Sequence, residues 1–416
     1  MTAGSTRAAD DRSRQVAGPQ GLAAEALRTV LRFTDWLDAQ GPLSLDQYDY
    51  WANPLGRRAK AVYYRRRALG LPLVAPFVAA DALAPSSRAI VWHRTRFPIA
   101  DAHFAMGFCL LAQPDRAKWL PRAVPFLDAL VEQRCASEAD YCWGYPFDWE
   151  TCFGTWPAGT PLITSTPYGY EAFEAAHALT GSQEARAIME SVGRFAFGRI
   201  RSTEVAPGVK AATYSPVDSR RVVNASSYRG FLLAAAGTRF GHSDWVAEAR
   251  AALRFVLWSQ QSDGSWLYAM DGKDAFIDNF HTCFVLKNLF KAWRVLGDED
   301  LRAAIDKGYD FYKSHLLDDG GLPVPFARAQ RLTLQRRDLY DYAEGINLGL
   351  LLADVDPDAS AIAAVMLAEV LNRWVLADGH FVTRETVFGR NTIPYHRWAQ
   401  AQMFRALVCA ARGRAD

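Results

Sequence analysis

The feature that most constrains this chain is an internal repeat. Six times, roughly 60 residues apart, a polar or aromatic cluster leads into an apolar, small-residue stretch with helical periodicity. These stretches cover residues 100–112, 171–179, 231–240, 285–293, 348–353 and 402–411. Each unit has room for two helices and their loops, so we expect about six helical hairpins.

A second set of predicted helices alternates with the first. In these, apolar residues recur at intervals of three and four, with Arg, Lys, Asp and Glu between them, over residues 22–37, 120–132, 184–197, 244–259, 300–315 and 360–374. An apolar helix must be enclosed, whereas an amphipathic helix can face solvent on one side. We therefore predict an all-α fold, an (α/α)6 toroid or barrel of helical hairpins, as a single domain over residues 19–416.

Composition and charge narrow the class of protein further. Half of the residues are hydrophobic and 12% are aromatic, which supports a large core. The formal net charge of +2 gives no electrostatic footprint for a nucleic-acid partner. Residues 1–18 lack an apolar segment and are predicted to be a disordered tail. No run reaches the roughly 18 apolar residues of a transmembrane helix, so we expect a cytoplasmic protein.

The cysteines predict neither a disulfide framework nor a zinc site. There are six, scattered along the chain without a C-x-x-C pair, as is typical of reduced, buried thiols. We predict no cofactor and no metal, although an Asp/His site at Asp278 and His281 stays open.

In a toroid, the clusters that precede the inner helices gather at one end and form a mouth. Helix caps account for single Ser, Thr, Asp and Asn residues there. Caps do not account for recurrent aromatic, His and Arg side chains, which favour a carbohydrate-type cleft. The predicted substrate-binding residues in these clusters are Tyr168, Asn224, Tyr228, Asn279, Tyr342 and Asn347.

A long loop over residues 141–167 is rich in aromatic residues and is expected to lie over this mouth. Trp143, Tyr145 and Trp149 have faces that can stack on sugar rings, while Asp148 and Glu150 can bind hydroxyls or move protons. The alternative is that these aromatic side chains only close the barrel as a hydrophobic cap.

Two further stretches carry candidate catalytic groups. Asp278 and His281 are three residues apart on one helical face, and a carboxylate–imidazole pair can transfer protons near neutral pH. Glu344 begins an inner helix, where a carboxylate needs a partner or a cavity, and is the first candidate for the catalytic carboxylate. The alternative for both is a structural role at a helix start.

The last unit contains side chains suited to an anionic sugar. Arg384 and Arg397 can bind a carboxylate through their planar guanidinium groups, and Tyr395 and His396 can transfer protons. Near the other end of the chain, a basic run over residues 57–67 is expected to be a solvated helical face.

Residues 260–266 (QQSDGSW), with Phe255-Val256 before them, resemble the glutamine–tryptophan repeat of triterpene cyclases, which are α/α toroids. Weaker similarity occurs at residues 318–321 and 378–381. The resemblance implies the hairpin fold. It does not imply the cyclase reaction, because the Asp-x-Asp-Asp acid motif of those enzymes is not found.

A broader resemblance covers most of the chain. Residues 48–55 (YDYWANPL), 142–149 (CWGYPFDW), 159–161 (GTP) and 278–282 (DNFHT) resemble bacterial proteins encoded with exopolysaccharide biosynthesis genes. This resemblance implies a pathway rather than a reaction. In addition, Tyr395-His396 before the last inner helix is similar to the heparan-type glucuronyl C5-epimerases.

Three functions remain open at this point. The first is an enzyme acting on a polysaccharide, oligosaccharide or lipid-linked glycan. It would be either a uronosyl epimerase or lyase, or a glycoside hydrolase with two carboxylates among Asp148, Asp278 and Glu344. The second is a non-catalytic glycan-binding or assembly protein. The third is an isoprenoid-handling toroid, which predicts an apolar cavity.

Overall fold

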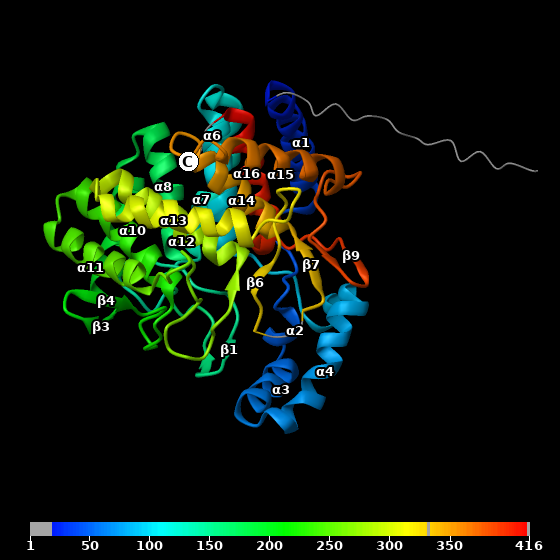
Figure 1. The fold of residues 1–416 in the computed structure, drawn as a ribbon. Helices are drawn as coiled ribbons and strands as arrows, with labels where there is room; N and C mark the ends of the chain where they lie inside the picture. The colour runs from blue at the N-terminus through cyan, green and yellow to red at the C-terminus, as the bar shows by residue number, and fades with distance from the viewer. Residues whose placement is uncertain (1–18, 331–332, 414–416) are drawn as a thin grey trace, which may run out of the picture.

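The computed structural model describes residues 19–330 and 333–413, which form two concentric layers of helices (Figure 1). Each inner helix contacts the next one along the chain, and the last inner helix contacts the first, so the ring is closed. The inner helices are α6 (Pro98–Ala112), α8 (Thr166–Thr180), α10 (Val223–Phe240), α12 (Asn279–Leu296), α14 (Leu339–Leu352) and α16 (Ala401–Arg412), the last preceded by the short irregular helix η2 (His396–Gln400).

The outer layer packs around this ring and leaves one face of each helix in solvent. Its members are α1 (Pro19–Gln40), α7 (Arg116–Glu132), α9 (Gln183–Gly198), α11 (Ser243–Ser259), α13 (Glu299–His315) and α15 (Ala359–Arg373). Both sets of predicted helices correspond to these elements, and the predicted (α/α)6 toroid is confirmed. The predicted disordered tail, residues 1–18, lies outside the described residues.

Short turns lead from inner to outer helices at one end of the ring. Gly181, Gly241 and Gly297 end α8, α10 and α12 with φ angles of 72°, 79° and 64°, the left-handed conformation that glycine adopts without steric cost. Ser182 and Asp298 then cap the next helices by accepting backbone N–H groups. The chain therefore reverses within two residues at each of these three turns.

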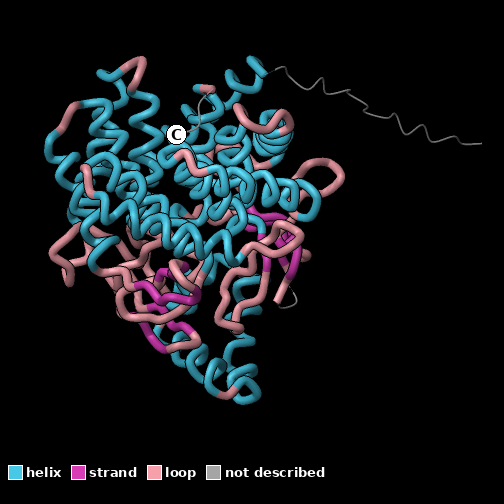
Figure 2. The backbone as a smooth tube through the Cα atoms, turned by 60° about the vertical axis from the view of Figure 1, so that its left-hand side comes forward, coloured by secondary structure: helices cyan, strands magenta, loops and turns pink. Residues whose placement is uncertain are grey.

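The return connections are long and carry all the described strands, which gather at the opposite end (Figure 2). Antiparallel pairing joins β1 (Trp149–Thr151) to β2 (Gly154–Trp156), β3 (Ser202–Ala206) to β4 (Val209–Ala212), β5 (Ile277–Asp278) to β6 (Phe326–Arg328), and β7 (Gln335–Asp338) to β8 (Arg384–Thr386) and β9 (Gly389–Asn391). Because the inner helices begin at this end, their N-termini face the long loops.

Between α1 and α6 the chain makes a helical excursion that projects beyond the strand-bearing end (Figure 1). It contains α2 (Asp49–Ala52), α3 (Pro54–Arg65), α4 (Arg67–Leu83), η1 (Pro85–Ser87) and α5 (Arg88–Val91). Among the described residues, no single helix has the length and apolar character to cross a membrane, whereas α4 taken with η1 and α5, across a 115° bend, passes that test as a pair.

Tryptophan–glycine contacts anchor two of the long loops to the helices. The Trp143 ring lies on Gly169 of α8, and the Trp266 ring lies on Gly308 of α13. The Trp266 indole N–H donates to the Val256 carbonyl at 2.9 Å, while the Gln260 amide donates to the Ala304 carbonyl at 3.0 Å. The segment that resembles the cyclase repeat thus ties α11 to α13.

Candidate active site

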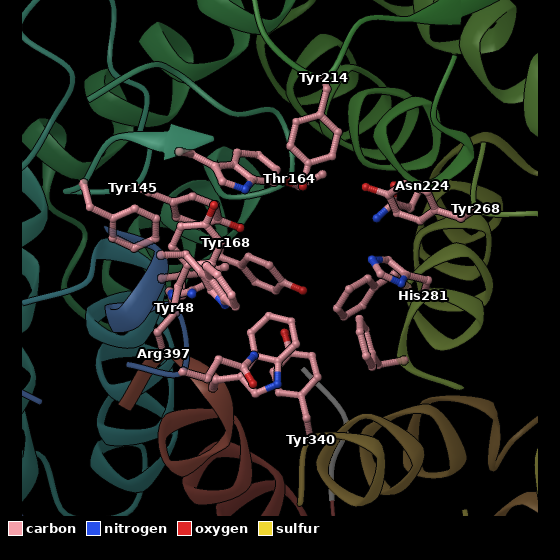
Figure 3. Close-up of a pocket in the computed structure, with 18 of the residues that line it drawn as sticks. Tyr48, Tyr145, Thr164, Tyr168, Tyr214, Asn224, Tyr268, His281, Tyr340 and Arg397 are labelled. Carbon is pink, nitrogen blue, oxygen red and sulfur yellow. The ribbon is translucent and has the colours of Figure 1, made fainter. Parts of the chain in front are cut away.

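A cavity of about 420 Å³ opens where the inner helices begin (Figure 3). Its wall is mainly aromatic, with polar groups from Thr164, Asn224 and His281 between the rings. Seven tyrosines line it: Tyr48, Tyr145, Tyr168, Tyr214, Tyr228, Tyr268 and Tyr340. Such a wall offers both flat faces for stacking and hydroxyls for hydrogen bonding, as a sugar ligand requires.

His281 is held by Asp278, the residue that caps α12. The Asp278 carboxylate accepts the backbone N–H of His281 at 3.3 Å, and its two oxygens lie 2.9 and 2.7 Å from the imidazole Nδ1. Asp278 is buried, while His281 keeps 22% of its side chain exposed and points into the cavity (Figure 3). A carboxylate on Nδ1 favours the tautomer with its proton there, which leaves the Nε2 lone pair for a ligand.

Aromatic rings surround this imidazole on several sides. Its ring centre lies 4.3 Å from that of Phe280, 4.7 Å from that of Tyr268 and 5.6 Å from that of Phe284. Phe280 in turn meets the edge of Trp398 at 5.4 Å. These contacts fix the orientation of the imidazole and limit its access to water.

The tyrosine hydroxyls are donors rather than bases. Burial, followed by the nearby Glu344 carboxylate, raises the pKa of Tyr168 well above its ordinary value. Burial likewise raises the pKa of Tyr228 and Tyr340. The hydroxyls of Tyr168 and Tyr228 are hydrogen-bonded at 2.5 Å. Near neutral pH these groups stay protonated and can donate hydrogen bonds to oxygen atoms of a ligand.

Arg397 and Trp398 reach the cavity from a strained segment. Trp398 has φ −127° and ψ 67°, and Ala399 has φ 124°, so η2 does not continue smoothly into α16. The Arg397 guanidinium lies 4.6 Å from the Tyr145 ring centre and donates to both Asp46 oxygens, at 2.9 and 2.6 Å. Because the Arg397 guanidinium donates to Asp46, Arg397 contributes its flat guanidinium face to the cavity wall and stacks on Tyr145.

The helical excursion closes one side of the cavity. Trp51 and Lys60 line it, and the Lys60 ammonium donates to the Tyr48 hydroxyl at 2.9 Å. Asp81 also lines it and pairs with the buried Arg88. Part of the basic run that was expected to be a solvated face therefore lines the cavity, and Arg57 pairs with Asp148.

A second cavity of about 510 Å³ adjoins the first. The two share four wall residues, Trp149, Tyr214, Tyr268 and His281. Glu150 and Arg220 lie in the second cavity, where Arg220 pairs with Asp271 and Asp274. His281 thus stands where two lobes of one cleft meet.

Two ion pairs lie on the inner helices away from the cavity wall. Lys287 pairs with Glu344, and Lys291 pairs with Glu171. Glu344 is fully buried and does not line either lobe. Burial and the carboxylates of Asp338 and Asp278 raise the pKa of neighbouring Asp341 well above its usual range.

The structure brings about half of the predicted site residues to the cleft. The wall of the first lobe contains Tyr145, Trp149, Tyr168, Asn224, Tyr228, His281 and Arg397, and Glu150 lines the second lobe. Asp278 stands directly behind His281.

The other predicted site residues lie away from the wall, and all of them except Asn347 have protein partners there. Trp143 donates to the Leu130 carbonyl, Asn279 to the carbonyls of Leu316 and Val324, and Arg384 to Asp338 and Gln47; Tyr342 packs on Trp374, Tyr395 packs on Arg88, His396 contacts the Pro42 carbonyl, Asp148 pairs with Arg57, and Asn347 is half-buried on α14. Glu344 pairs with Lys287 through Oε2, while Glu344 Oε1 and Asn347 Nδ2 are buried without a hydrogen-bond partner among the described residues.

Several wall residues were not singled out as site residues from the sequence. Trp51, Lys60 and Asp81 come from the excursion, which interrupts the repeat, and Tyr48 directly precedes it. The others are Gln47, Ile99, Phe147, Thr164, Tyr214, Tyr268, Phe280, Phe284, Tyr340 and Trp398. The sequence feature that could have identified some of these wall residues is the group of aromatic residues in the DNFHT and YDYW segments. Within residues 19–330 and 333–413, no three His, Cys, Asp or Glu side chains form a potential metal site.

Solved structures with the same architecture are enzymes of carbohydrates. An unsaturated glucuronyl hydrolase specific for heparin superposes with a TM-score of 0.60 and 11% identity, over 93% of this chain and 95% of that one. The GH76 α-mannanase of Bacteroides thetaiotaomicron superposes with a TM-score of 0.58 and 9% identity, over 88% of this chain and 98% of that one. A sugar epimerase from a ruminal bacterium superposes with a TM-score of 0.56 and 12% identity, over 76% of this chain and 88% of that one. At these identities the likeness shows the fold.

No protein-family model matches the chain, and no curated protein matches it. None of these comparisons links it to exopolysaccharide gene clusters.

Proposed function

We propose that this protein is a carbohydrate-active enzyme that transfers a proton at a sugar carbon, as an epimerase or lyase does, with His281 as the base. The observation that carries the proposal is the His281–Asp278 pair. Asp278 engages Nδ1, and the imidazole points into an aromatic cavity, which leaves Nε2 as the ring nitrogen available to a ligand. The structural neighbours, whose names identify them as a glucuronyl hydrolase, a mannanase and a sugar epimerase, support a glycan substrate.

The geometry assigns distinct tasks to the surrounding groups. His281 Nε2 takes a proton from a carbon next to a carboxylate or carbonyl group, and the resulting imidazolium is stabilised by Asp278. Negative charge then develops on the substrate oxygen, where protonated tyrosine hydroxyls such as Tyr168 and Tyr340 donate hydrogen bonds. Delivery of a proton to the opposite face by a second acid, a tyrosine hydroxyl or water, gives the epimer and leaves His281 protonated. Elimination of the 4-substituent, which takes up the proton from the His281 imidazolium and leaves as an alcohol, gives the unsaturated sugar.

Hydrolysis by two carboxylates has less support from this wall. Such a mechanism needs carboxyl groups roughly 5–9.5 Å apart on either side of the glycosidic bond. Asp81 is the one carboxylate among the described residues that line the first lobe, and it pairs with Arg88. Of the three predicted candidates, Glu344 pairs with Lys287, Asp148 pairs with Arg57 and Asp278 is engaged by His281.

The test is incubation with acidic and neutral bacterial glycans in D2O, followed by NMR and by ultraviolet absorbance of unsaturated uronates. We expect deuterium at a ring carbon, or unsaturated product, with the wild type and a loss of about 10²-fold or more in His281→Asn. His242→Asn is the matched control, because His242 also pairs with a carboxylate, Glu190, but lies outside both lobes. New reducing ends that persist in His281→Asn would contradict the proposal and favour hydrolysis. Saturable binding without turnover would favour an assembly protein.

The pathway inference rests on sequence resemblance. We propose a polysaccharide, oligosaccharide or lipid-linked glycan of an exopolysaccharide pathway as the substrate, supported by the YDYWANPL and DNFHT segments, which both contribute to the cavity wall. The isoprenoid alternative is less well supported, because polar groups from seven tyrosines, Asn224 and His281 line the space.

A further inference from the structure

The helical excursion differs in charge from the rest of the chain. Residues 49–91 contain seven basic residues and two acidic residues, while the whole chain has a net charge of only +2, so the remainder is net negative. Arg58, Arg65 and Arg66 are exposed and form no ion pair with any residue in the described ranges. A concentrated positive charge of this kind attracts an anionic surface.

The same excursion exposes large apolar side chains. Leu69, Leu71, Leu73, Val78 and Leu83 of α4 each leave 47–66% of their surface in solvent. Residues 68–80 contain no charged or polar side chain, and only Gly70 and Val74 of α4 are buried. Exposed apolar surface on this scale marks a binding site rather than an ordinary solvated helix.

The positive charge and the exposed apolar side chains together indicate which kind of partner binds the excursion. A symmetric contact between two copies would bring two strongly basic excursions together, and their repulsion opposes it. A nucleic acid would satisfy the arginines but not the leucines of α4. A bilayer with anionic lipids satisfies both, because headgroups bind arginine and the acyl boundary accepts leucine. We propose that this excursion is a peripheral membrane-binding element that docks on an anionic bilayer surface.

Docking of the excursion on a bilayer also determines where the cavity lies. Trp51, Lys60 and Asp81 belong to the excursion and line the cavity. The element also projects at the strand-bearing end, where the cavity opens (Figure 1). Membrane attachment therefore brings the cleft close to the bilayer surface, where the glycan portion of a lipid-linked substrate lies.

The experiment is flotation of the full chain with vesicles of phosphatidylcholine and phosphatidylglycerol, compared with phosphatidylcholine alone. We expect binding to the anionic vesicles and at least about tenfold weaker binding to the neutral ones. Two variants are tested: Arg58→Ser/Arg65→Ser/Arg66→Ser, and Leu71→Ser/Leu73→Ser. Each should reduce binding about tenfold, whereas the control Leu27→Ser/Leu31→Ser, on exposed positions of α1, should bind like the wild type.

Far-UV circular dichroism establishes that each variant is folded, and the two variant sets change different chemistry. Absence of wild-type binding to the anionic vesicles would overturn the proposal, as would binding that neither variant reduces. A solution dimer that Leu71→Ser/Leu73→Ser dissociates, without vesicle binding, would assign the face to a second copy and overturn it as well. None of these outcomes depends on whether His281 is a base.

Discussion

The Asp278 carboxylate has two tasks at the start of α12. It caps the helix through the His281 backbone N–H and orients the His281 ring through Nδ1. Asn can perform the first task, because an amide oxygen also caps a helix, but it cannot stabilise an imidazolium. We expect Asp278→Asn to reduce deuterium incorporation by about 10²–10⁴-fold with little change in the midpoint of urea unfolding.

Nitrogen-15 NMR of labelled histidine provides an independent measurement of this effect. In the wild type, the His281 signals should report a proton on Nδ1, and this preference should weaken in Asp278→Asn. Unchanged turnover in a variant with an altered tautomer would show that the pair is a structural cap alone.

The Lys287–Glu344 pair predicts a large and recoverable loss of stability. Both side chains are buried, so Lys287→Met leaves the Glu344 carboxylate without its counter-charge. The expected cost is about 3–5 kcal/mol of unfolding free energy in urea, and Lys287→Met/Glu344→Leu should recover most of it. Arg122→Met, at the exposed pair with Asp38, is the control and should cost less than about 1 kcal/mol. A double variant no more stable than Lys287→Met would contradict a simple charge-pair explanation.

At this scale, residue type alone does not distinguish a cavity group from a buried ion pair. Glu344 and His281 both stand near the start of an inner helix, yet Glu344 meets Lys287 from the neighbouring helix and His281 points into the cavity. The position of a partner on another helix depends on the rotation of both helices, which the spacing along the chain does not give. The Asp278–His281 contact is local, three residues apart, and could therefore be predicted as a pair.

At the scale of elements, glycines let the long loops reach the helices. A Cβ atom on Gly308 of α13 would lie 2.4 Å from the Trp266 ring, closer than a real contact permits. Gly308→Ala should therefore cost about 1–3 kcal/mol of unfolding free energy, despite the higher helix propensity of alanine. Gly198→Ala, near the end of α9 with open space around it, is the matched control and should be neutral or stabilising. Equal stability of the two variants would show that the Trp266 ring moves aside at no cost.

The two layers of helices were predictable, whereas only the basic helical run of the excursion was, and the strands were not. Inner and outer helices differ in periodicity because one set is enclosed and the other half-solvated. Helix α4 has an all-apolar stretch with Pro72 and Pro76 inside, so it shows neither amphipathic spacing nor an enclosed position. The described strands span two to five residues and pair across loops, and pairs this short leave little periodic signal.

For the whole molecule, closure of the ring brings η2 against α1 and makes stability depend on pH. His396 of η2 is buried against Trp36 of α1, and its Nδ1 lies 3.3 Å from the Pro42 carbonyl. Burial, together with nearby Arg94, lowers the pKa of His396 to about 4, below the roughly 6.5 of an unfolded chain. Between these two values the unfolded chain binds a proton that the folded chain does not, so stability falls as the pH decreases from 6.5 to 4.

The contribution of His396 to the pH dependence of stability can be measured by comparing the wild type with His396→Gln. The wild type should be the more stable at pH 7, and its advantage should shrink by about 3 kcal/mol as the pH falls towards 4, at roughly 1.4 kcal/mol per pH unit. Urea unfolding of both proteins at several pH values measures this advantage. Other titrating groups are common to both proteins and cancel in the difference. An advantage that stays constant over this pH range would mean that His396 is protonated as readily in the closed ring as in the unfolded chain, and ring closure would then tolerate a buried charge.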